Sequence, residues 1–556
     1  MNRMMSGLNR LVRGIACVGI ALVVAMTVTS STQAQTPVVP AGSGTQGNPY
    51  RISQLGHLVW MSSNVTSSSG VYYTLQNDID ASATAGWNSG AGFAPIGIVY
   101  STPFLGIFNG NGKVISNLSI NRPSEDGVGL FRYLGYYAVV KNLGLAGVLV
   151  TGTNQVGSLV GINGAGSTVS NCYATGSVTG GGECVGGLVG ENDNGRVIGC
   201  YATSAVAGDY IVGGLVGNDV GTVSGCYATG SVTGRSTVGG LVGDIAGGAV
   251  VSECYAMGAV TGRDYVGGLV GYSSGNVSGS HATGAVTGRG PVGGLVGHSG
   301  NWLWDCYATG SVIGNDSVGG LVGENVNAMS GSYATGSVTG VDAINIAGVV
   351  DVACQLGGLV GANYGPVSEC YATGAVDGSG GWRWFGGLMG YNNDTVSNCY
   401  ATGSVIGNEA VGGLVGENDY GTVSRSYWDT ETSGQATSAG GTGKITVQMK
   451  QQVTFVGWDF ANVWRITENV TYPLFVTPPT NPQVQTSDGS FGVRTNRFGF
   501  NITGTSGLVI VVEACTNLAH PIWSPVGTNT LTGGSSYFSD PKWTNYPGRF
   551  YRLRSP

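Results

Sequence analysis

The sequence predicts an all-β protein whose main part is a parallel β-helix, or β-solenoid, of about ten rungs. Three observations lead to this prediction. The motif Gly-Gly-Leu-Val-Gly, which we call the anchor, returns at intervals of mostly 26–29 residues. Glycine accounts for 101 of the 556 residues, so turns must be frequent. The residues between the glycines are rich in Val and Tyr, which favour strands over helices.

The chain begins with a segment typical of a signal peptide, residues 1–34. Residues 1–13 carry three arginines and no acid, and residues 14–28 are apolar. Small residues before Ala34 fit a signal-peptidase site, so we expect cleavage after Ala34. An uncleaved N-terminal anchor is the alternative. The prediction implies a secreted or cell-surface location.

The charge balance limits the partners of the mature chain. Loss of the three arginines leaves 20 basic against 30 acidic residues, a net charge of −10. Without a basic surface to neutralise phosphates, a nucleic-acid partner is not expected. No other run reaches the ~18 apolar residues of a membrane span, so we expect no transmembrane segment after signal cleavage.

The repeats occupy residues 151–430. One repeat suits one coil of two or three short strands, and coils would stack at about 4.8 Å. One step is 38 residues long, and we expect its extra residues, near 342–354, to form a loop that bulges from one rung. Ten anchors, two of them variants, begin at Gly157, Gly186, Gly213, Gly239, Gly267, Gly293, Gly319, Gly357, Gly386 and Gly412.

One position of the repeat alternates between Cys and Ser. A site that accepts both requires a small side chain, so we expect this column to face inward and not to form cross-links. Cys184, Cys354 and Cys515 lie outside this register, and the sequence leaves their disulfide state open. The column contains Cys172, Cys200, Cys226, Ser280, Cys254, Cys306, Ser332, Cys370, Cys399 and Ser426.

The residue after the Cys/Ser position is Tyr in nine rungs and His281 in the tenth. Two residues before it come charged residues such as Glu253 and Asp305, which we expect to face water, so period two places the aromatic ring outward. The column could bind sugars by stacking, or its rings could stack on one another as a stabilising ladder. A bend could also turn the rings inward. This candidate binding stripe contains Tyr173, Tyr201, Tyr227, Tyr255, Tyr307, Tyr333, Tyr371, Tyr400 and Tyr427.

A turn with frequent Asn follows each anchor. Stacked amides can form hydrogen bonds along the solenoid axis, so we expect a stabilising ladder. Its predicted members are Asn163, Asn192, Asn218, Asn325, Asn363, Asn392 and Asn418.

Acidic residues stand at the same turn in three consecutive rungs: Glu191, Asp219 and Asp244. Stacked carboxylates could bind calcium or act as an acid/base pair. Most rungs lack this acid and no Lys or Arg column accompanies it, so surface acids or incidental calcium are favoured over catalysis. We therefore expect no catalytic residue, and no cofactor other than calcium.

The sequence offers few residues for familiar catalytic motifs. It contains only four histidines, and it lacks His-Glu-x-x-His and phosphate-loop patterns. The glycine-rich runs are explained as solenoid turns.

The anchor resembles the signature of the GLUG-motif repeat family, seen for example as Gly187-Leu188-Val189-Gly190. Residues 35–150 are similar to the region that precedes such repeats, so we expect them to form an N-terminal cap and the first coils. Residues 431–477 resemble the segment that closes the repeats. The family occurs in secreted and surface proteins of bacteria, but the repeat implies no particular chemistry.

The last part of the chain changes character. Residues 478–484 contain three prolines and are predicted to be a linker. Residues 485–556 are predicted to form a small all-β, sandwich-like module with strands near 493–502, 509–515 and 549–553. The run from Val512 to Leu518 is similar to a C-terminal module on exported proteins of planctomycete- and verrucomicrobium-like bacteria, which implies a sorting or attachment unit.

These observations favour a non-enzymatic extracellular or cell-surface repeat protein, a scaffold or adhesin-like surface for glycans or proteins. The alternative is a carbohydrate-active β-helix enzyme, a polysaccharide lyase or glycosidase. A third hypothesis is a spacer that only projects the C-terminal module.

Overall fold

The chain divides into two compact units in a computed structural model. The first comprises Met1–Trp428 and Thr432–Gly441, and the second Asp429–Glu431 and Thr442–Pro556. The predicted signal peptide, Cys354 and most of the predicted linker lie outside the described residues. The structure describes residues 36–554, except 65–68, 98–100, 342, 345–349, 352–354, 380–382, 477–482, 486–489, 495–496, 504–508, 517–523, 532–534 and 547.

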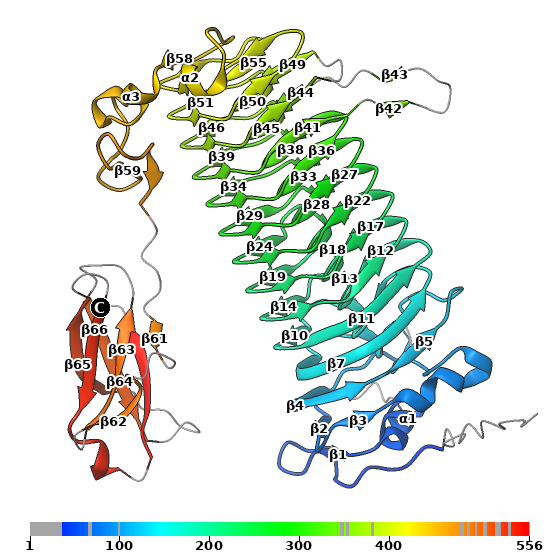
Figure 1. The fold of residues 1–556 in the computed structure, drawn as a ribbon. Coiled ribbons are helices and arrows are strands. Elements are labelled where there is room, and N and C mark those ends of the chain that lie inside the picture. Colours follow the sequence, from blue (N-terminus) through cyan, green and yellow to red (C-terminus); the bar gives the residue numbers. More distant parts are fainter. Residues whose placement is uncertain are drawn as a thin grey trace, which may run out of the picture. The chain divides into compact units, whose positions relative to one another are not determined.

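The first unit is a parallel β-solenoid, coloured cyan to yellow in Figure 1. Equivalent strands of successive rungs pair in parallel and in register, so the prediction of an all-β solenoid of about ten rungs is confirmed. The strands that enter the anchors form a sheet of ten: β8 (Val156–Gly157), β12 (Glu183–Gly186), β17 (Tyr210–Gly213), β22 (Ser236–Gly239), β27 (Asp264–Gly267), β32 (Pro291–Gly293), β37 (Asp316–Gly319), β44 (Gln355–Gly357), β49 (Trp384–Gly386) and β54 (Val411–Gly412).

The strands that leave the anchors form a second sheet, of eleven strands. Its members are β6 (Phe131–Leu134), β9 (Val160–Asn163), β13 (Val189–Asn192), β18 (Val216–Asp219), β23 (Val242–Ile245), β28 (Val270–Ser273), β33 (Val296–Ser299), β38 (Val322–Asn325), β45 (Val360–Asn363), β50 (Met389–Asn392) and β55 (Val415–Asn418).

A third sheet completes each rung with three very short strands. In one rung these are β19 (Thr222–Ser224), β20 (Tyr227–Ala228) and β21 (Val232–Thr233). The interior is filled by stacked Val, Leu, Ala and Cys side chains, almost all fully buried. Burial of like residues rung upon rung is what holds a repeat that has no core of its own.

The N-terminal coils are less regular than the repeats. Longer strands and one helix cover this end, and the same hydrophobic core runs through them. The elements are β1 (Tyr50–Ile52), α1 (Leu55–Ser63), β2 (Tyr72–Leu75), β3 (Ile79–Asp80), β4 (Ile107–Ser116), β5 (Ser119–Asn121), β7 (Val139–Gly152), β10 (Thr168–Ser170) and β11 (Tyr173–Gly180).

The anchor glycines are required by close backbone approach. A Cβ on Gly213 would lie 1.9 Å from the carbonyl oxygen of Val216 and 2.7 Å from the amide nitrogen of Gly243 in the next rung. Neither backbone atom can move aside cheaply. The anchor motif is therefore the part of the repeat that lets two strands of one rung, and two adjacent rungs, pack without side chains between them.

The residue two positions before each aromatic position lies at a corner of the rung and has a left-handed backbone conformation. Across the ten rungs its φ lies between 44° and 61°. The residues are Asn171, Gly199, Gly225, Glu253, Gly279, Asp305, Gly331, Glu369, Asn398 and Arg425. Their composition, mostly Gly and Asn, follows from this backbone conformation rather than from exposure alone. Charge was thus an incomplete explanation of the position. The outward orientation inferred from it for the aromatic rings fails at Tyr371, Tyr400 and Tyr427, which are buried.

The long step between Gly319 and Gly357 contains a hairpin. Its strands β42 (Ala343–Ile344) and β43 (Val350–Asp351) pair antiparallel and leave the rung as a projecting loop (Figure 1). Of the expected bulge near residues 342–354, only residues 343–344 and 350–351 are among the described residues, and their antiparallel pairing departs from the parallel pairing of the rungs.

Short elements follow the last rung. They are α2 (Thr430–Ser433), β58 (Thr442–Lys444), α3 (Thr446–Met449), β59 (Trp464–Arg465) and β60 (Leu474–Phe475), and a cluster of aromatic rings lies among residues 455–475 of the second unit. Trp464 is fully buried, with ring centroids of Trp458 and Phe475 at 4.5 and 4.6 Å. No helix among the described residues is long and apolar enough to span a membrane.

Two antiparallel sheets follow in the second unit. Phe500, Ile510, Val512 and Phe538 belong to their shared core. The predicted strand 493–502 is in fact two strands, because the chain reverses between Arg494 and Arg497. The sheets contain β61 (Gln483–Gln485), β62 (Gly492–Arg494), β63 (Arg497–Thr503) and β66 (Ser535–Asp540), and β64 (Val509–Cys515), β65 (Ser524–Thr530) and β67 (Phe550–Arg554).

Candidate binding surface

The Cys/Ser column faces inward, as predicted. Every described member is buried, and the cysteines are free thiols. The amide nitrogens of Cys172 and Cys200 lie 3.4 and 3.3 Å from the sulfur one rung further on, and Cys254 N–H donates to Ser280 Oγ at 3.1 Å. A thiol or hydroxyl can fill this role, which explains the alternation. Burial raises the pKa of Cys306 to about 12, so this thiol is unreactive.

The cysteines outside the column are also buried. Cys184 lies on β12 and Cys515 on β64, and both are free. Burial, reinforced by the charge of Glu191, raises the pKa of Cys184 to about 12. The Cys184 thiol is therefore not poised for reaction.

The aromatic residues form one continuous stack, which we call the tyrosine column. From Tyr173 to Tyr400, neighbouring ring centroids are 4.5–5.2 Å apart and the rings are within 9° of parallel. His281 continues the stack between Tyr255 and Tyr307. The column begins over Gly144, where the Tyr173 ring fills the space that a side chain would need.

Exposure changes along the tyrosine column. The first seven members are half-buried, whereas Tyr371, Tyr400 and Tyr427 are buried, at 6%, 0% and 8% exposed. Because each ring uses its faces on its neighbours, only ring edges and hydroxyls remain for a partner. Burial raises the pKa of Tyr201 and Tyr227, so their neutral hydroxyls can both donate and accept hydrogen bonds.

A buried ladder of side-chain amides follows the anchors, six residues after each first glycine. We call it the amide ladder. Asn163 donates to Asn192 and Asn192 to Asp219, both at 2.6 Å. Three further bonds of 2.7–2.8 Å join the last four members. The position is occupied in order by Asn163, Asn192, Asp219, Ile245, Ser273, Ser299, Asn325, Asn363, Asn392 and Asn418.

The expected ladder is corrected at one residue. Asn218 was assigned to it, but the register pairs Asn218 with Glu191 and Asp244, and pairs Asp219 with Asn192. Successive residues of a strand point to opposite faces, so a shift of one position exchanges inside for outside. Asn218 is therefore outside the ladder and Asp219 is in it.

The same register separates the three calcium candidates. Glu191 and Asp244 are half-buried on the outer face, two rungs apart with Asn218 between them, whereas Asp219 is fully buried. The three carboxylates therefore do not form one column. Within the described residues, no three His, Cys, Asp or Glu side chains are grouped to bind a metal ion. Calcium binding remains a prediction, and the outer pair with Asn218 is its basis.

Burial acts strongly on the carboxyls of this region. It raises the pKa of Asp219 to about 7, although bonds from Asn192 and the Gly221 amide oppose it. Burial likewise raises the pKa of Asp244 to about 6, and that of Glu191. Ile245, Ser273 and Ser299 occupy the next three ladder positions after Asp219, so the amides are interrupted until Asn325.

An aromatic and acidic cluster stands on the outer face in the column of Asp244. Tyr272 and His298 stack at 4.5 Å, and His298 Nδ1 lies 3.2 Å from Glu324 Oε2. Tyr265 meets both rings edge-on, at 5.5 and 6.0 Å. Burial and the nearby Glu324 charge raise the pKa of Tyr265. The sequence analysis did not predict this cluster. Its signal is that Tyr272, His298 and Glu324 each stand five residues after the first glycine of an anchor.

A column of arginines was also missed. Arg235, Arg263 and Arg289 each stand four residues before an anchor, on three consecutive rungs. This column precedes the anchors, whereas Glu191, Asp219 and Asp244 follow them. The signal was present in the sequence as three copies of Thr-Gly-Arg at spacings of 28 and 26 residues.

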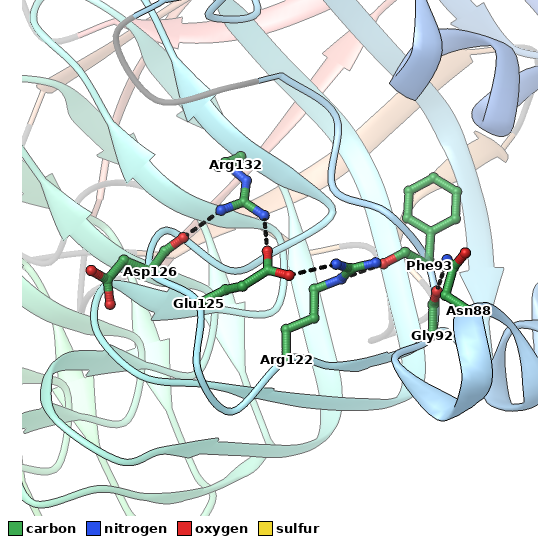
Figure 2. Close-up of polar contacts among 7 residues, drawn as sticks. All are labelled: Asn88, Gly92, Phe93, Arg122, Glu125, Asp126 and Arg132. Atoms are coloured by element: carbon green, nitrogen blue, oxygen red, sulfur yellow. Dashed lines mark hydrogen bonds and ion pairs between the residues drawn. The ribbon is translucent and has the colours of Figure 1, made fainter.

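The N-terminal coils contain a compact ion-pair network, drawn in Figure 2. Glu125 accepts a bond from Arg122 at 2.7 Å and is also paired with Arg132. Arg122 and Arg132 also bind the carbonyl oxygens of Phe93 and Asp126. Burial tends to raise the pKa of Glu125, but the two arginines outweigh it and lower the pKa. Because these charged groups bind one another and nearby carbonyl oxygens, the network stabilises the coil around residues 122–132.

The fold and these columns define a class: a repeat protein built as a parallel β-solenoid. Three of its segments, residues 152–179, 181–207 and 262–287, match the family model described as the GLUG motif. The chain is 41% identical over 152 residues to Halomucin of Haloquadratum walsbyi. It is 37% identical over 136 residues to a putative Gly-rich membrane protein of Evansella cellulosilytica.

These relatives are much larger than the matched region. The matches cover 27% and 24% of this chain, but 2% and 15% of the two relatives. The similarity therefore concerns about a quarter of this chain, and leaves most of each relative without a counterpart in the alignment.

Proposed function

We propose that this protein is an extracellular or cell-surface scaffold, without enzymatic activity, whose outer columns bind glycans or proteins. The tyrosine column carries the proposal. It offers half-exposed ring edges and hydroxyls at one-rung intervals along several consecutive rungs. A repeated ligand, or several units of one polymer, can contact equivalent groups in turn, which adds weak contacts into useful avidity.

The comparisons support the surface location in a general way. Proteins named Halomucin and putative Gly-rich membrane protein share the repeats. Export by residues 1–34 and attachment by the C-terminal module belong to the same proposal. In this view the regular solenoid positions its outer columns and the last module sorts or attaches the chain.

The test removes hydroxyls and keeps the stack. In the full chain, Tyr201→Phe, Tyr227→Phe and Tyr255→Phe together leave the ring faces in contact. A glycan array and a set of surface proteins are probed with this variant and the wild type. We expect about tenfold weaker binding of the ligands that the wild type retains, because three hydrogen bonds of roughly 0.5–1.5 kcal/mol are affected.

The matched control changes three tyrosines outside the column. Tyr136, Tyr137 and Tyr420 are 69%, 79% and 94% exposed, and their triple change to Phe should leave binding intact. Equal loss in both variants, or no ligand bound by the wild type, contradicts the proposal. Unchanged binding in the column variant would show that the tyrosine hydroxyls do not bind the ligand, and would also contradict the proposal.

The polysaccharide-cleaving alternative is favoured by one observation, the His298–Glu324 pair beside Tyr265. A histidine held by a carboxylate can act as a general base. A lyase and hydrolase screen on the full chain decides the matter. Turnover that disappears in His298→Gln and persists in Glu191→Gln/Asp219→Asn/Asp244→Asn would replace the scaffold proposal by catalysis at this cluster.

A further inference from the structure

The arginine column is a regular surface feature distinct from the tyrosine column. The amide of Arg263 donates to the carbonyl of Arg235 at 2.8 Å, and the amide of Arg289 to that of Arg263 at 2.7 Å. The three side chains therefore leave the backbone at equivalent points, one rung apart. Rungs are spaced by about 4.8 Å, the distance between neighbouring strands.

The column concentrates positive charge in a region that has little. Residues 157–428 contain six basic residues, all arginines, against 19 acidic ones. Half of the basic residues thus lie in this one column. Like charges at equivalent positions of paired strands repel one another, so the arrangement is unfavourable unless anions compensate it.

Two members of the column have only loose partners within the protein. Arg263 Nε lies 3.5 Å from Asp264 Oδ2, and the two side chains are 51% and 39% exposed. Arg235 is exposed and lies over the Tyr210 ring, 5.6 Å from its centroid. Exposed pairs of this kind are weak and screened by salt, so the guanidinium groups of Arg235 and Arg263 keep the capacity to bind an external anion.

A column of hydroxyls runs beside the arginines. Thr233, Thr261 and Thr287 each precede an arginine by two residues, pair in register and are exposed. On these three consecutive rungs the surface therefore repeats one guanidinium group and one hydroxyl group. This combination suits a ligand that repeats an acid group together with hydroxyl groups.

We propose that Arg235, Arg263 and Arg289, with the neighbouring threonines, bind a linear polysaccharide that carries one carboxylate or sulfate on successive sugars. Arginine binds such groups through two parallel hydrogen bonds, and threonine hydroxyls suit sugar hydroxyls. Nucleic acid fits less well, because Asp209, Asp264 and Asp316 flank the column and the chain has a net charge of −7. The site uses none of the residues of the tyrosine column, so each proposal can fail alone.

The experiment measures binding of polygalacturonate, dextran sulfate and neutral dextran to the full chain. The test variant is Arg235→Gln/Arg263→Gln/Arg289→Gln. The matched control, Arg196→Gln/Arg383→Gln/Arg425→Gln, removes the same charge from the other three arginines of the repeats, which are all exposed. Thermal unfolding of both variants verifies that they fold.

We expect the wild type to bind one or both acidic polymers and not dextran, with affinity that falls as salt is added. The test variant should bind about 10- to 100-fold more weakly, as expected for three exposed ion pairs, and the control within about twofold of the wild type. Changing the three arginines to lysine should give an intermediate loss of affinity, because lysine keeps the positive charge but cannot form bidentate hydrogen bonds.

The polymer that binds identifies the acid group, carboxylate or sulfate. The proposal is overturned if neither acidic polymer binds better than dextran, or if the test and control variants lose affinity equally. Tighter binding of single-stranded DNA than of either polysaccharide would also overturn it, in favour of a nucleic-acid ligand.

Discussion

The amide ladder and the tyrosine column follow the same solenoid with the same rung spacing, yet they differ in burial. In the ladder, side chains bond to one another at 2.6–2.8 Å and all but Asn418 are buried. In the tyrosine column, rings stack at 4.5–5.2 Å and the first seven members are half-exposed. Repetition alone therefore does not distinguish a structural column from one that can bind a ligand.

The difference lies in what each column loses when one member is removed. A buried amide leaves partners that cannot reach water, so loss of one ladder residue destabilises the solenoid strongly. A half-exposed ring leaves neighbours that water can cover. We therefore expect the ladder to stabilise the fold. Substitutions in the outer columns should cost less stability, so these columns can acquire residues that bind ligands.

The largest effect is expected from Asn363→Ala in the ladder. Asn363 accepts from Asn325 and donates to Asn392, both at 2.8 Å, so its loss leaves one N–H of the buried Asn325 amide and the Oδ1 of the buried Asn392 amide without that partner. We expect a loss of about 3–5 kcal/mol in the free energy of unfolding, measured by urea denaturation. The control Asn393→Ala, at the half-buried residue that follows Asn392, should cost under about 1 kcal/mol. Equal costs would remove the distinction between the columns.

The carboxyl in the ladder should make stability depend on pH. The pKa of Asp219 is raised from 3.8 to about 7 in the folded state, so the folded chain binds the extra proton between these values. The stabilisation that protonated Asp219 gives is complete below pH 4. As the pH rises to 7 this stabilisation is lost, and the free energy of unfolding falls by up to about 4 kcal/mol.

Asp219→Asn keeps the hydrogen-bonding shape without the charge. Urea midpoints from pH 4 to pH 7.5 should therefore fall less steeply in this variant, which should be the more stable of the two at pH 7. A wild-type profile that rises over this range, with no difference in the variant, would show that Asp219 is not protonated in the fold.

A smaller loss is expected from Tyr227→Ala in the tyrosine column. The ring stacks on Tyr201 and Tyr255 at 4.7 and 4.8 Å but is half-buried. We expect a cost of about 1–2 kcal/mol, below that of Asn363→Ala, because water can cover the exposed neighbours. Tyr227→Phe should cost almost nothing. A cost for alanine above that of the ladder variant would make the column primarily structural.

The smallest effect concerns a corner that belongs to neither column. Glu253 has a φ of 54°, and the equivalent residues Gly225 and Gly279 have 60° and 55°. Because glycine adopts this conformation without strain, Glu253→Gly should stabilise the protein by about 0.5–1 kcal/mol. Lower stability would mean that the glutamate side chain itself contributes.

The regular parts of the molecule could be predicted from the sequence because each feature recurs ten times. Glycine anchors, the inward Cys/Ser position and the aromatic position all follow from spacing and strand alternation. The errors came from positions that spacing alone cannot resolve. Asn218 and Asp219 are adjacent polar residues, and only the strand register shows which one enters the ladder.

The aromatic and acidic cluster of the candidate surface was less predictable than the columns, because its residue types do not repeat. Tyr272, His298 and Glu324 share one outer position but differ in chemistry, and Tyr265 joins them from another strand. Such clusters depend on three-dimensional register. The arginine column is the exception, since Thr-Gly-Arg recurs in the sequence and a search for every repeated charge would have found it.

The central claim is that the chain is exported and displays its outer columns outside the cell. The most direct test is fractionation of cells that make the protein, followed by N-terminal sequencing of the chain in each fraction. The account predicts a chain at the cell surface or in the medium that begins at Gln35. A chain that stays in the cytoplasmic fraction and begins at Met1 would contradict it.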